Sequence, residues 1–209
     1  MTYYFNSSNP RSASKLSLQL KKIIDSECLK SQKIIFLCIG SDRVCGDSLG
    51  PIIGYKLSFF KNKPFKVIGS LASPVHGVNL KDTISAITNS YVNPYIIAID
   101  ASLGQASHIG RITLGYGSLK PGLGVKKKLP EVGNIYITGI VNNSNFKDSS
   151  TLSTTRLYTI MLLADVITSA IALTFSLNPY HYTLPTPELL SAPVHSEELC
   201  ESPVVFQEQ

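Results

Sequence analysis

Two aspartates, each placed just after a short apolar run, are the strongest candidates for chemistry in this sequence. Asp47 lies in the segment GSDRVCGDSLGP, which follows the apolar run at 33–39, and Asp100 directly follows YIIAI at 95–99. Two carboxylates that face one crevice can share a proton, so that one acts as a base and the other as an acid on a water or a carbonyl group. The pair therefore indicates general acid–base chemistry.

Each aspartate also has a purely structural interpretation. Asp is favoured at helix N-caps, so Asp47, or Ser48 beside it, is available to cap a helix that begins at residue 49. Asp100 follows apolar residues directly, so an ionised side chain there needs a partner, and the backbone of a loop could supply it. The sequence leaves both interpretations open.

Three further residues are candidates for holding a substrate. Arg43 lies in the first loop and His76 in the loop ASPVHG, while Lys126 begins a run of three lysines that could clamp an acidic group, although such runs usually form a solvated face. Cys45 with His76 could form a nucleophile and base, but no third, orienting group is evident. We therefore predict substrate-binding roles for Arg43, His76 and Lys126.

No metal or cofactor is expected. The four cysteines form no CxxC pair and no metal-finger spacing, and the histidines show no metal-ligand spacing. No GxGxxG is present, and Asp47 stands where a phosphate loop would place a lysine. Free thiols fit a reducing cytosol.

A cytoplasmic protein without a membrane span is expected. The first residues lack the apolar region of a signal peptide, and the most apolar segment, 157–175, is interrupted by Asp165. The net charge is +5, but residues 185–209 hold five of the 14 acidic residues and no Lys or Arg, so the rest carries nine acidic and 19 basic residues, or +10. That surplus could attract an acidic partner, but it identifies none.

Strands and helices alternate along the chain in the order that places the two aspartates together. Apolar runs predict buried strands at 33–39, 66–71 and 95–99, with helices at 49–60 and 79–90 between them. This alternation predicts a mostly parallel sheet with the first strand in the middle, so that Asp47 and Asp100 reach one crevice. Other predicted elements are an amphipathic helix from Leu16 to Cys28, strands at 110–117 and 134–141, and a long helix at 152–176.

The predicted fold is a single α/β domain of three layers, α/β/α. Residues 1–13 are rich in Ser and Asn and are expected to be flexible, 14–176 form the domain, and 177–209 form a tail rich in Pro and Glu. The tail is expected to be dispensable for folding.

Several ordered motifs resemble one family. The segments IGSDRVCGDSLGP (39–51), SPVHGVNL (73–80), the stretch 97–142 and TTRLYTIMLLAD (154–165) resemble the YyaC-type sporulation proteins of spore-forming Firmicutes. That family looks related to germination protease, which degrades small acid-soluble spore proteins, and more distantly to hydrogenase maturation endopeptidases. The resemblance implies their phosphorylase/hydrolase-like α/β fold.

The resemblance also implies a function. In germination protease, aspartates in motifs similar to GDSLGP and IDAS carry an atypical aspartic-type peptidase activity, which points to Asp47 and Asp100 as catalytic. Hydrogenase maturation enzymes have a nickel-binding Glu where this chain has Ser48, so a nickel site is not expected. The expected function is that of a metal-independent peptidase acting on spore proteins in the forespore or mother-cell cytosol.

An alternative from another class is a non-catalytic module that binds a peptide in the same crevice. A peptidase needs the two carboxyls close together with one pKa raised, whereas a binding module needs only the crevice. No direct nucleic-acid binding is expected, and a homo-oligomer is possible.

Overall fold

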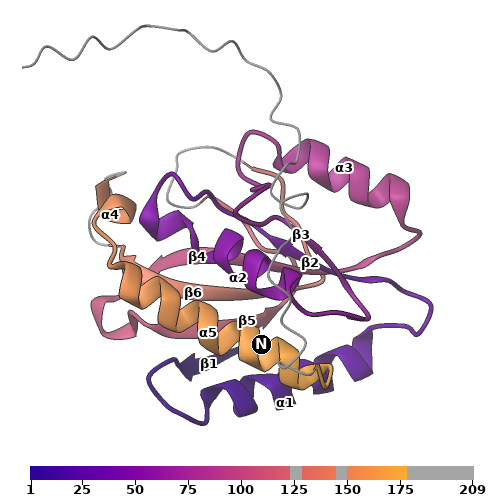
Figure 1. Ribbon diagram of the computed structural model, residues 1–209, viewed down its shortest axis with the longest axis horizontal. Helices are drawn as coiled ribbons and strands as arrows, with labels where there is room; N and C mark the ends of the chain where they lie inside the picture. Colours follow the sequence, from indigo (N-terminus) through magenta and orange to yellow (C-terminus); the bar gives the residue numbers. More distant parts are fainter. Residues whose placement is uncertain (123–128, 145–149, 178–209) are drawn as a thin grey trace, which may run out of the picture.

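One mixed sheet of six strands organises the chain (Figure 1). The computed structural model describes residues 1–122, 129–144 and 150–177. The strands lie in the order β1-β5-β6-β4-β2-β3. Their bounds are β1 Thr2–Asn6, β2 Ile34–Cys38, β3 Lys66–Ile68, β4 Tyr95–Gly104, β5 Arg111–Tyr116 and β6 Ile135–Asn143.

Four neighbouring strands, β3, β2, β4 and β6, run parallel, while β5 is antiparallel to both of its neighbours, β1 and β6. The prediction that 33–39, 66–71 and 95–99 are adjacent parallel strands with the first in the middle is confirmed, because β2 pairs with β3 on one side and β4 on the other. Apart from the half-buried Ile34, the apolar side chains of β2 and of the first half of β4 are buried, as expected for strands covered on both faces.

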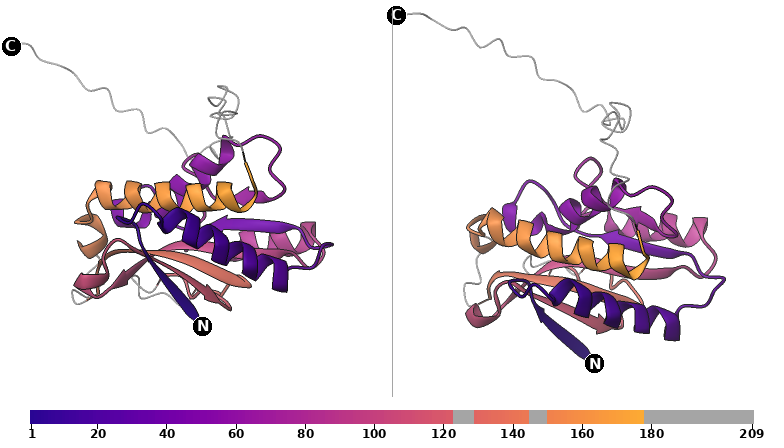
Figure 2. Two further views of the ribbon diagram at one scale, coloured as in Figure 1. Left: turned by 90° about the horizontal axis from the view of Figure 1, so that it is seen from below. Right: turned by 60° about the horizontal axis from the view of Figure 1, so that its bottom comes forward.

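Helices cover both faces of the sheet, which gives the expected α/β/α layers (Figure 2). Helices α1, α2 and α5 pack on one face, and α3 packs on the other. The helices are α1 Ser12–Glu27, α2 Leu49–Ser58, α3 Leu80–Ser90, α4 Ser150–Ser153 and α5 Leu157–Thr174, with short 3-10 turns η1 Cys45–Asp47 and η2 Ala106–His108.

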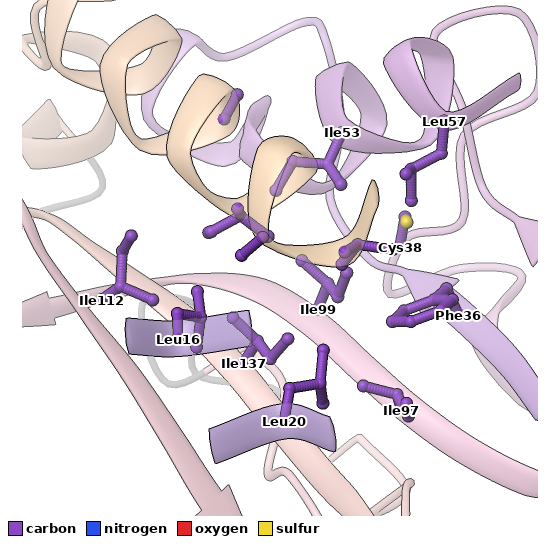
Figure 3. Packing of buried hydrophobic residues seen from close by; sticks show 14 of the residues in the cluster. Leu16, Leu20, Phe36, Cys38, Ile53, Leu57, Ile97, Ile99, Ile112 and Ile137 are labelled. Atoms are coloured by element: carbon purple, nitrogen blue, oxygen red, sulfur yellow. The ribbon is translucent and has the colours of Figure 1, made fainter. Parts of the chain in front are cut away.

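The main core lies between the sheet and the three helices on its first face. Figure 3 shows leucines of α1, isoleucine and leucine of α2, and alternate side chains of β2, β4, β5 and β6 meeting there. A smaller core lies under α3 on the second face and includes Leu37, Val75 and Leu80. Successive residues of β4 alternate between the two cores, because side chains of a strand point to opposite faces in turn.

Two predictions about the ends of the domain are wrong. The expected flexible start at 1–13 holds β1, which pairs with β5 and places Tyr3 and Phe5 against the main core. The predicted helix at 152–176 is divided into α4 and α5, and the Asn142 side chain donates to the carbonyl of Thr151 and the hydroxyl of Thr155 at this break. The predicted tail at 177–209 lies, apart from Leu177, outside the described residues.

Within the described part of the chain, α5 is the helix long and apolar enough to cross a membrane by length and composition. Its mean hydropathy is 1.8, and half of it is buried inside the structure. The buried half packs against α1 and α2, and Asp165 on the outer side pairs with Lys56 of α2 at 2.9 Å. Packing in the core therefore accounts for much of its apolar character.

Gly50, in the first turn of α2, lies against the sheet, and substituting it tests how closely this helix approaches the sheet. A Cβ at Gly50 would overlap the backbone of Ile39. Ala normally stabilises a helix by about 1 kcal/mol relative to Gly. Here we expect Gly50→Ala to lower the free energy of unfolding by about 2 kcal/mol or more, since backbone atoms must move. Urea denaturation measures this change.

Gly77→Ala is the matched control, because a Cβ there would meet only the flexible side chain of Leu129, at 3.3 Å. We expect its stability to stay within about 0.5 kcal/mol of the wild type. A Gly50→Ala variant as stable as this control would show that α2 does not approach the sheet as described.

Candidate functional site

The two aspartates lie where the helices switch sides of the sheet. The connection from β2 to β3 runs through α2 on the first face, whereas the connection from β3 to β4 runs through α3 on the second face. The neighbours β2 and β4 therefore form the topological switch point, where parallel α/β sheets usually bind ligands at the carboxyl ends of the strands.

A tight loop after β2 positions Asp47. The Ser41 N–H donates to the backbone carbonyl of Asp47 at 3.0 Å, which closes the loop around η1. Gly40 has a φ of +137°, and a Cβ there would overlap that same carbonyl oxygen. Only glycine satisfies both conditions at low cost, so the glycine after the strand lets the loop fold back against the sheet.

Neither Asp47 nor Ser48 caps α2 through its side chain, although both were available for that role. Ser48 occupies the N-cap position of α2, but no side-chain cap hydrogen bond forms, and its hydroxyl donates to the carbonyl of Cys45 at 2.6 Å. The N-cap interpretation of Asp47 is therefore wrong. Its carboxylate is not committed to the helix end, which leaves it available for chemistry.

Asp100 lies inside β4 rather than at its end. The strand continues to Gly104 by pairing with β6, whereas the ladder between β2 and β4 stops at the pair Cys38–Ile99. Asp100 is therefore the first residue of β4 beyond that ladder. Its side chain is buried, with 5% of the residue exposed, and Oδ1 accepts a hydrogen bond from the Ala101 N–H at 2.8 Å.

The carboxyl groups of Asp47 and Asp100 interact electrostatically. Burial, followed by the negative charge of Asp47, raises the pKa of Asp100 well above its usual range, against a hydrogen bond from Ala101 that lowers it. Burial raises the pKa of Asp47 to about 6, against a hydrogen bond from the Ser41 backbone. None of the ion pairs found among the described residues includes either group. Burial therefore favours the protonated form of both carboxyl groups, and Asp47, with a pKa of about 6, is mostly ionised at neutral pH.

A row of side-chain hydroxyl groups extends from Asp100 across neighbouring strands of the sheet. Asp100 is paired in register with Thr138 of β6, and the Thr138 and Thr113 hydroxyls share a hydrogen bond of 2.5 Å. The Ser102 hydroxyl, on the same face as Asp100, lies 3.3 Å from that of Thr138. These residues were not predicted as part of the site. Their signal in the sequence is a lone threonine inside each of the apolar runs RITLGY and IYITGI.

The three predicted substrate-binding residues differ in position. Val75 bridges Ile39 at the end of β2, so His76 follows at the edge of the sheet that holds the aspartates. Its Nδ1 accepts from the Val78 N–H at 3.3 Å, so its contact is within its own loop. Arg43 is exposed and forms no ion pair with another described residue. Lys126 lies outside the described residues.

The aspartate pair defines the site, and neither of the two hollows described next includes it. Two hollows of the described surface lie elsewhere, one between α2 and α5 beside Lys56 and the other along Gly54 and Gly69. Among residues 1–122, 129–144 and 150–177, no group of three or more His, Cys, Asp or Glu side chains could hold a metal ion.

The raised pKa of Asp47 predicts a pH dependence of stability. The folded protein holds this proton more tightly than the unfolded chain, so stability falls as pH rises from the usual pKa of 3.8 to about 6. A shift of this size corresponds to about 3 kcal/mol. We expect Asp47→Asn to be more stable than the wild type at pH 7, with the difference vanishing near pH 4, in urea denaturation across this range.

Asp42→Asn is the matched control, since Asp42 lies exposed in the same loop. Its effect on the free energy of unfolding should stay within about 0.5 kcal/mol at every pH. Equal behaviour of the two variants, or a loss of stability in Asp47→Asn that grows with pH, would contradict burial of the Asp47 charge.

Known proteins match this chain over most of its length. The family described as "Protein of unknown function (DUF1256)" matches residues 4–170, a range that includes both aspartates. The "Uncharacterized protein YyaC" of Bacillus subtilis (strain 168) is 45% identical over 158 residues, which cover 75% of this chain and 77% of that protein. These findings confirm the YyaC-type resemblance. The chain belongs to the DUF1256 family.

Proposed function

We propose that this protein is a peptidase in which Asp47 and Asp100 activate a water molecule against a peptide carbonyl. The observation that carries the proposal is the interaction between a buried carboxyl and a second, half-buried carboxyl at the switch point of the sheet. Two titratable groups whose environments separate their pKa values are the usual arrangement for an acid and a base in one site.

The different environments of the two carboxyl groups give Asp47 and Asp100 different roles in the proposed reaction. Asp47, with a pKa of about 6, is mostly ionised at neutral pH and serves as the base. Asp100 is buried and its pKa is raised well above the usual range, so in the proposed reaction it holds the proton and serves as the acid that protonates the carbonyl oxygen. The Ala101 N–H holds Oδ1 of Asp100, which fixes the orientation of the carboxyl group.

The reaction balances with water as the only co-reactant. Asp47 takes a proton from water as the water oxygen bonds to the carbonyl carbon, and Asp100 gives its proton to the carbonyl oxygen. The tetrahedral intermediate then collapses: Asp47 returns its proton to the amide nitrogen, the C–N bond breaks, and the hydroxyl proton returns to Asp100. Both groups end in their starting states, and no metal takes part.

The family resemblance supplies the expected substrate. The GDSLGP and IDAS segments, which are similar to motifs of germination protease, hold the two aspartates described above. We therefore propose a protein substrate of the spore and a place of action in the cytosol of the sporulating cell.

The first test of this proposal replaces each aspartate by asparagine, which keeps the size and removes the exchangeable proton. Purified protein is incubated with a mixture of spore proteins, and new termini are identified by mass spectrometry. We expect Asp47→Asn and Asp100→Asn each to reduce cleavage about a hundredfold or more, with the double variant little worse, because the two residues act as one unit.

Asp42→Asn serves as control and should cleave at the rate of the wild type, as should wild type treated with a chelator. Full cleavage by either single variant would contradict the pair, and loss of activity with chelator that added metal restores would contradict a metal-free reaction. Tight peptide binding without any cleavage by the wild type would instead support the binding module.

The pH profile of cleavage separates the two roles. Ionisation of Asp47 should make kcat/KM rise as pH passes through about 6, and deprotonation of Asp100 should make it fall at a higher pH. The profile is measured on the wild type with one cleaved peptide. Highest activity well below the pKa of Asp47 would show that Asp47 is not the base.

A further inference from the structure

Strand β4 continues past the end of its neighbour β2 and is unpaired on that side. Its ladder with β2 stops at Ile99, whereas its ladder with β6 continues to Gly104. The chain that follows β2 does not extend the ladder, because the N–H of Ser41 donates to the backbone carbonyl of Asp47 at 3.0 Å. In the described sheet, residues 101–104 of β4 therefore have a free edge beside the Asp47 loop.

Alternate residues of β4 direct their backbone groups toward this edge. Tyr95 and Ile99 form backbone hydrogen bonds on the side of β2, whereas Gly104 forms one with the residue that follows β6. In a parallel ladder, successive residues of a strand bond to its two neighbours in turn. Ala101 and Leu103, which continue the first series, therefore face the free edge.

These two residues present backbone groups that the described part of the chain leaves unsatisfied. The carbonyl of Ala101 and both the N–H and the carbonyl of Leu103 have no hydrogen-bond partner among the described residues. The Ala101 N–H differs, because it donates to Oδ1 of Asp100 at 2.8 Å. Both residues are half-buried, and their side chains pack against the main core, so the edge is fixed in place and still accessible.

Asp100 lies at the beginning of the free edge. Because the Ala101 N–H points to the side of β2, the carboxyl oxygen that accepts it also lies on that side. This oxygen takes the position in which a neighbouring strand would place a carbonyl oxygen. The groups of Ala101 and Leu103 follow at an interval of two residues, about 6.6 Å along a strand. An extended polypeptide is the ligand whose own backbone groups repeat at this interval.

We propose that the substrate segment binds as an additional strand on the free edge of β4, with its scissile carbonyl at the carboxyl group of Asp100. The position of the scissile bond rests on the proposed peptidase. One N–H of the segment donates to the carbonyl of Ala101, and a residue farther along the segment bonds to Leu103. Because these contacts involve only backbone atoms of the segment, they select an extended stretch of protein over a helical one.

The two possible directions of the segment predict different contacts. In a segment parallel to β4, the second and fourth residues after the scissile bond donate their N–H groups to Ala101 and Leu103. In an antiparallel segment, the first and third residues before the scissile bond do so. In both cases the N–H of the residue between them points away from β4, so the contacts recur at every second position.

The first experiment methylates the backbone nitrogens of a bound peptide one at a time. A peptide that binds the Asp47→Asn variant, which should not cleave it, is selected from a displayed library of random sequences and then synthesised. Fluorescence anisotropy measures its dissociation constant. We expect methylation to raise this constant at least about tenfold at two positions two residues apart, because each loses a hydrogen bond. Methylation of the nitrogen between them is the matched control and should change it by less than about threefold.

The second experiment locates the peptide on the protein by NMR. Exchange of the Leu103 amide hydrogen with solvent is measured in the same variant with and without the peptide. We expect the peptide to slow this exchange at least about tenfold, because the amide gains an acceptor. Tyr4 is the matched control: its N–H faces the outer edge of β1, since the alternate residues of β1 that lead to Ser7 face β5. Its exchange should not change.

Three results would overturn strand addition: a library that yields no binding peptide, methylation effects without the two-residue alternation, or slower exchange at Tyr4 in place of Leu103. Cleavage of spore proteins alongside any of them would leave the aspartate pair as proposed. Alternating methylation effects with slower exchange at Leu103, but no cleavage by the wild type, would support strand addition and contradict the peptidase. The two proposals therefore fail separately.

Discussion

Asp100 is buried and interacts electrostatically with a second carboxyl group, that of Asp47. The structure at the carboxyl ends of β2 and β4 has to accommodate this interaction. Removing a carboxylate from water is costly unless it is paired or protonated. No described cation pairs with Asp100, so burial and the negative charge of Asp47 together raise the pKa of its carboxyl group well above the usual range. The folded chain thus holds two carboxyl groups that interact electrostatically and whose pKa values are both raised.

Such an arrangement destabilises the site and must be offset by packing elsewhere. The side chains between the sheet and helices α1, α2 and α5 supply that packing, with Leu16, Ile53 and Ile137 among those wholly buried. Each fully buried aliphatic side chain contributes about 1.5–3 kcal/mol. Asp100 lies in β4, whose earlier residues are fixed in both cores, so the strand cannot shift to expose the carboxyl without disturbing them.

Close approaches between backbone segments help to hold the Asp47 loop. Gly40 and Gly50 let the loop and the first turn of α2 lie directly against the backbone around residue 39, where a side chain would overlap it. Gly46 similarly lies against Leu152 of α4, so the loop is held from the side of β6 as well. Asp47 is therefore oriented by a compact frame, although its own carboxylate is not used to cap α2.

The sequence was sufficient to predict the parallel strands β2, β3 and β4, their order and the neighbouring aspartates. Continuous apolar runs and alternating helices are local signals, and the crossover rule converts them into an order of strands. It was not sufficient for β1, because TYYFN has only alternating character, and an edge strand is defined by its partner, here β5. The extension of β4 past Asp100 likewise depends on pairing with β6.

The sequence by itself determined which residues could do chemistry, and the tertiary structure decided their state. That Asp47 and Asp100 follow buried strands can be read directly from the chain. Which of them is protonated depends on burial and on the distance between two charges 53 positions apart, and neither quantity is encoded locally. The interpretation of Asp47 as a helix cap was decided in the same way, because the folded loop places Ser48 at the N-cap position of α2 and no side-chain cap hydrogen bond forms there.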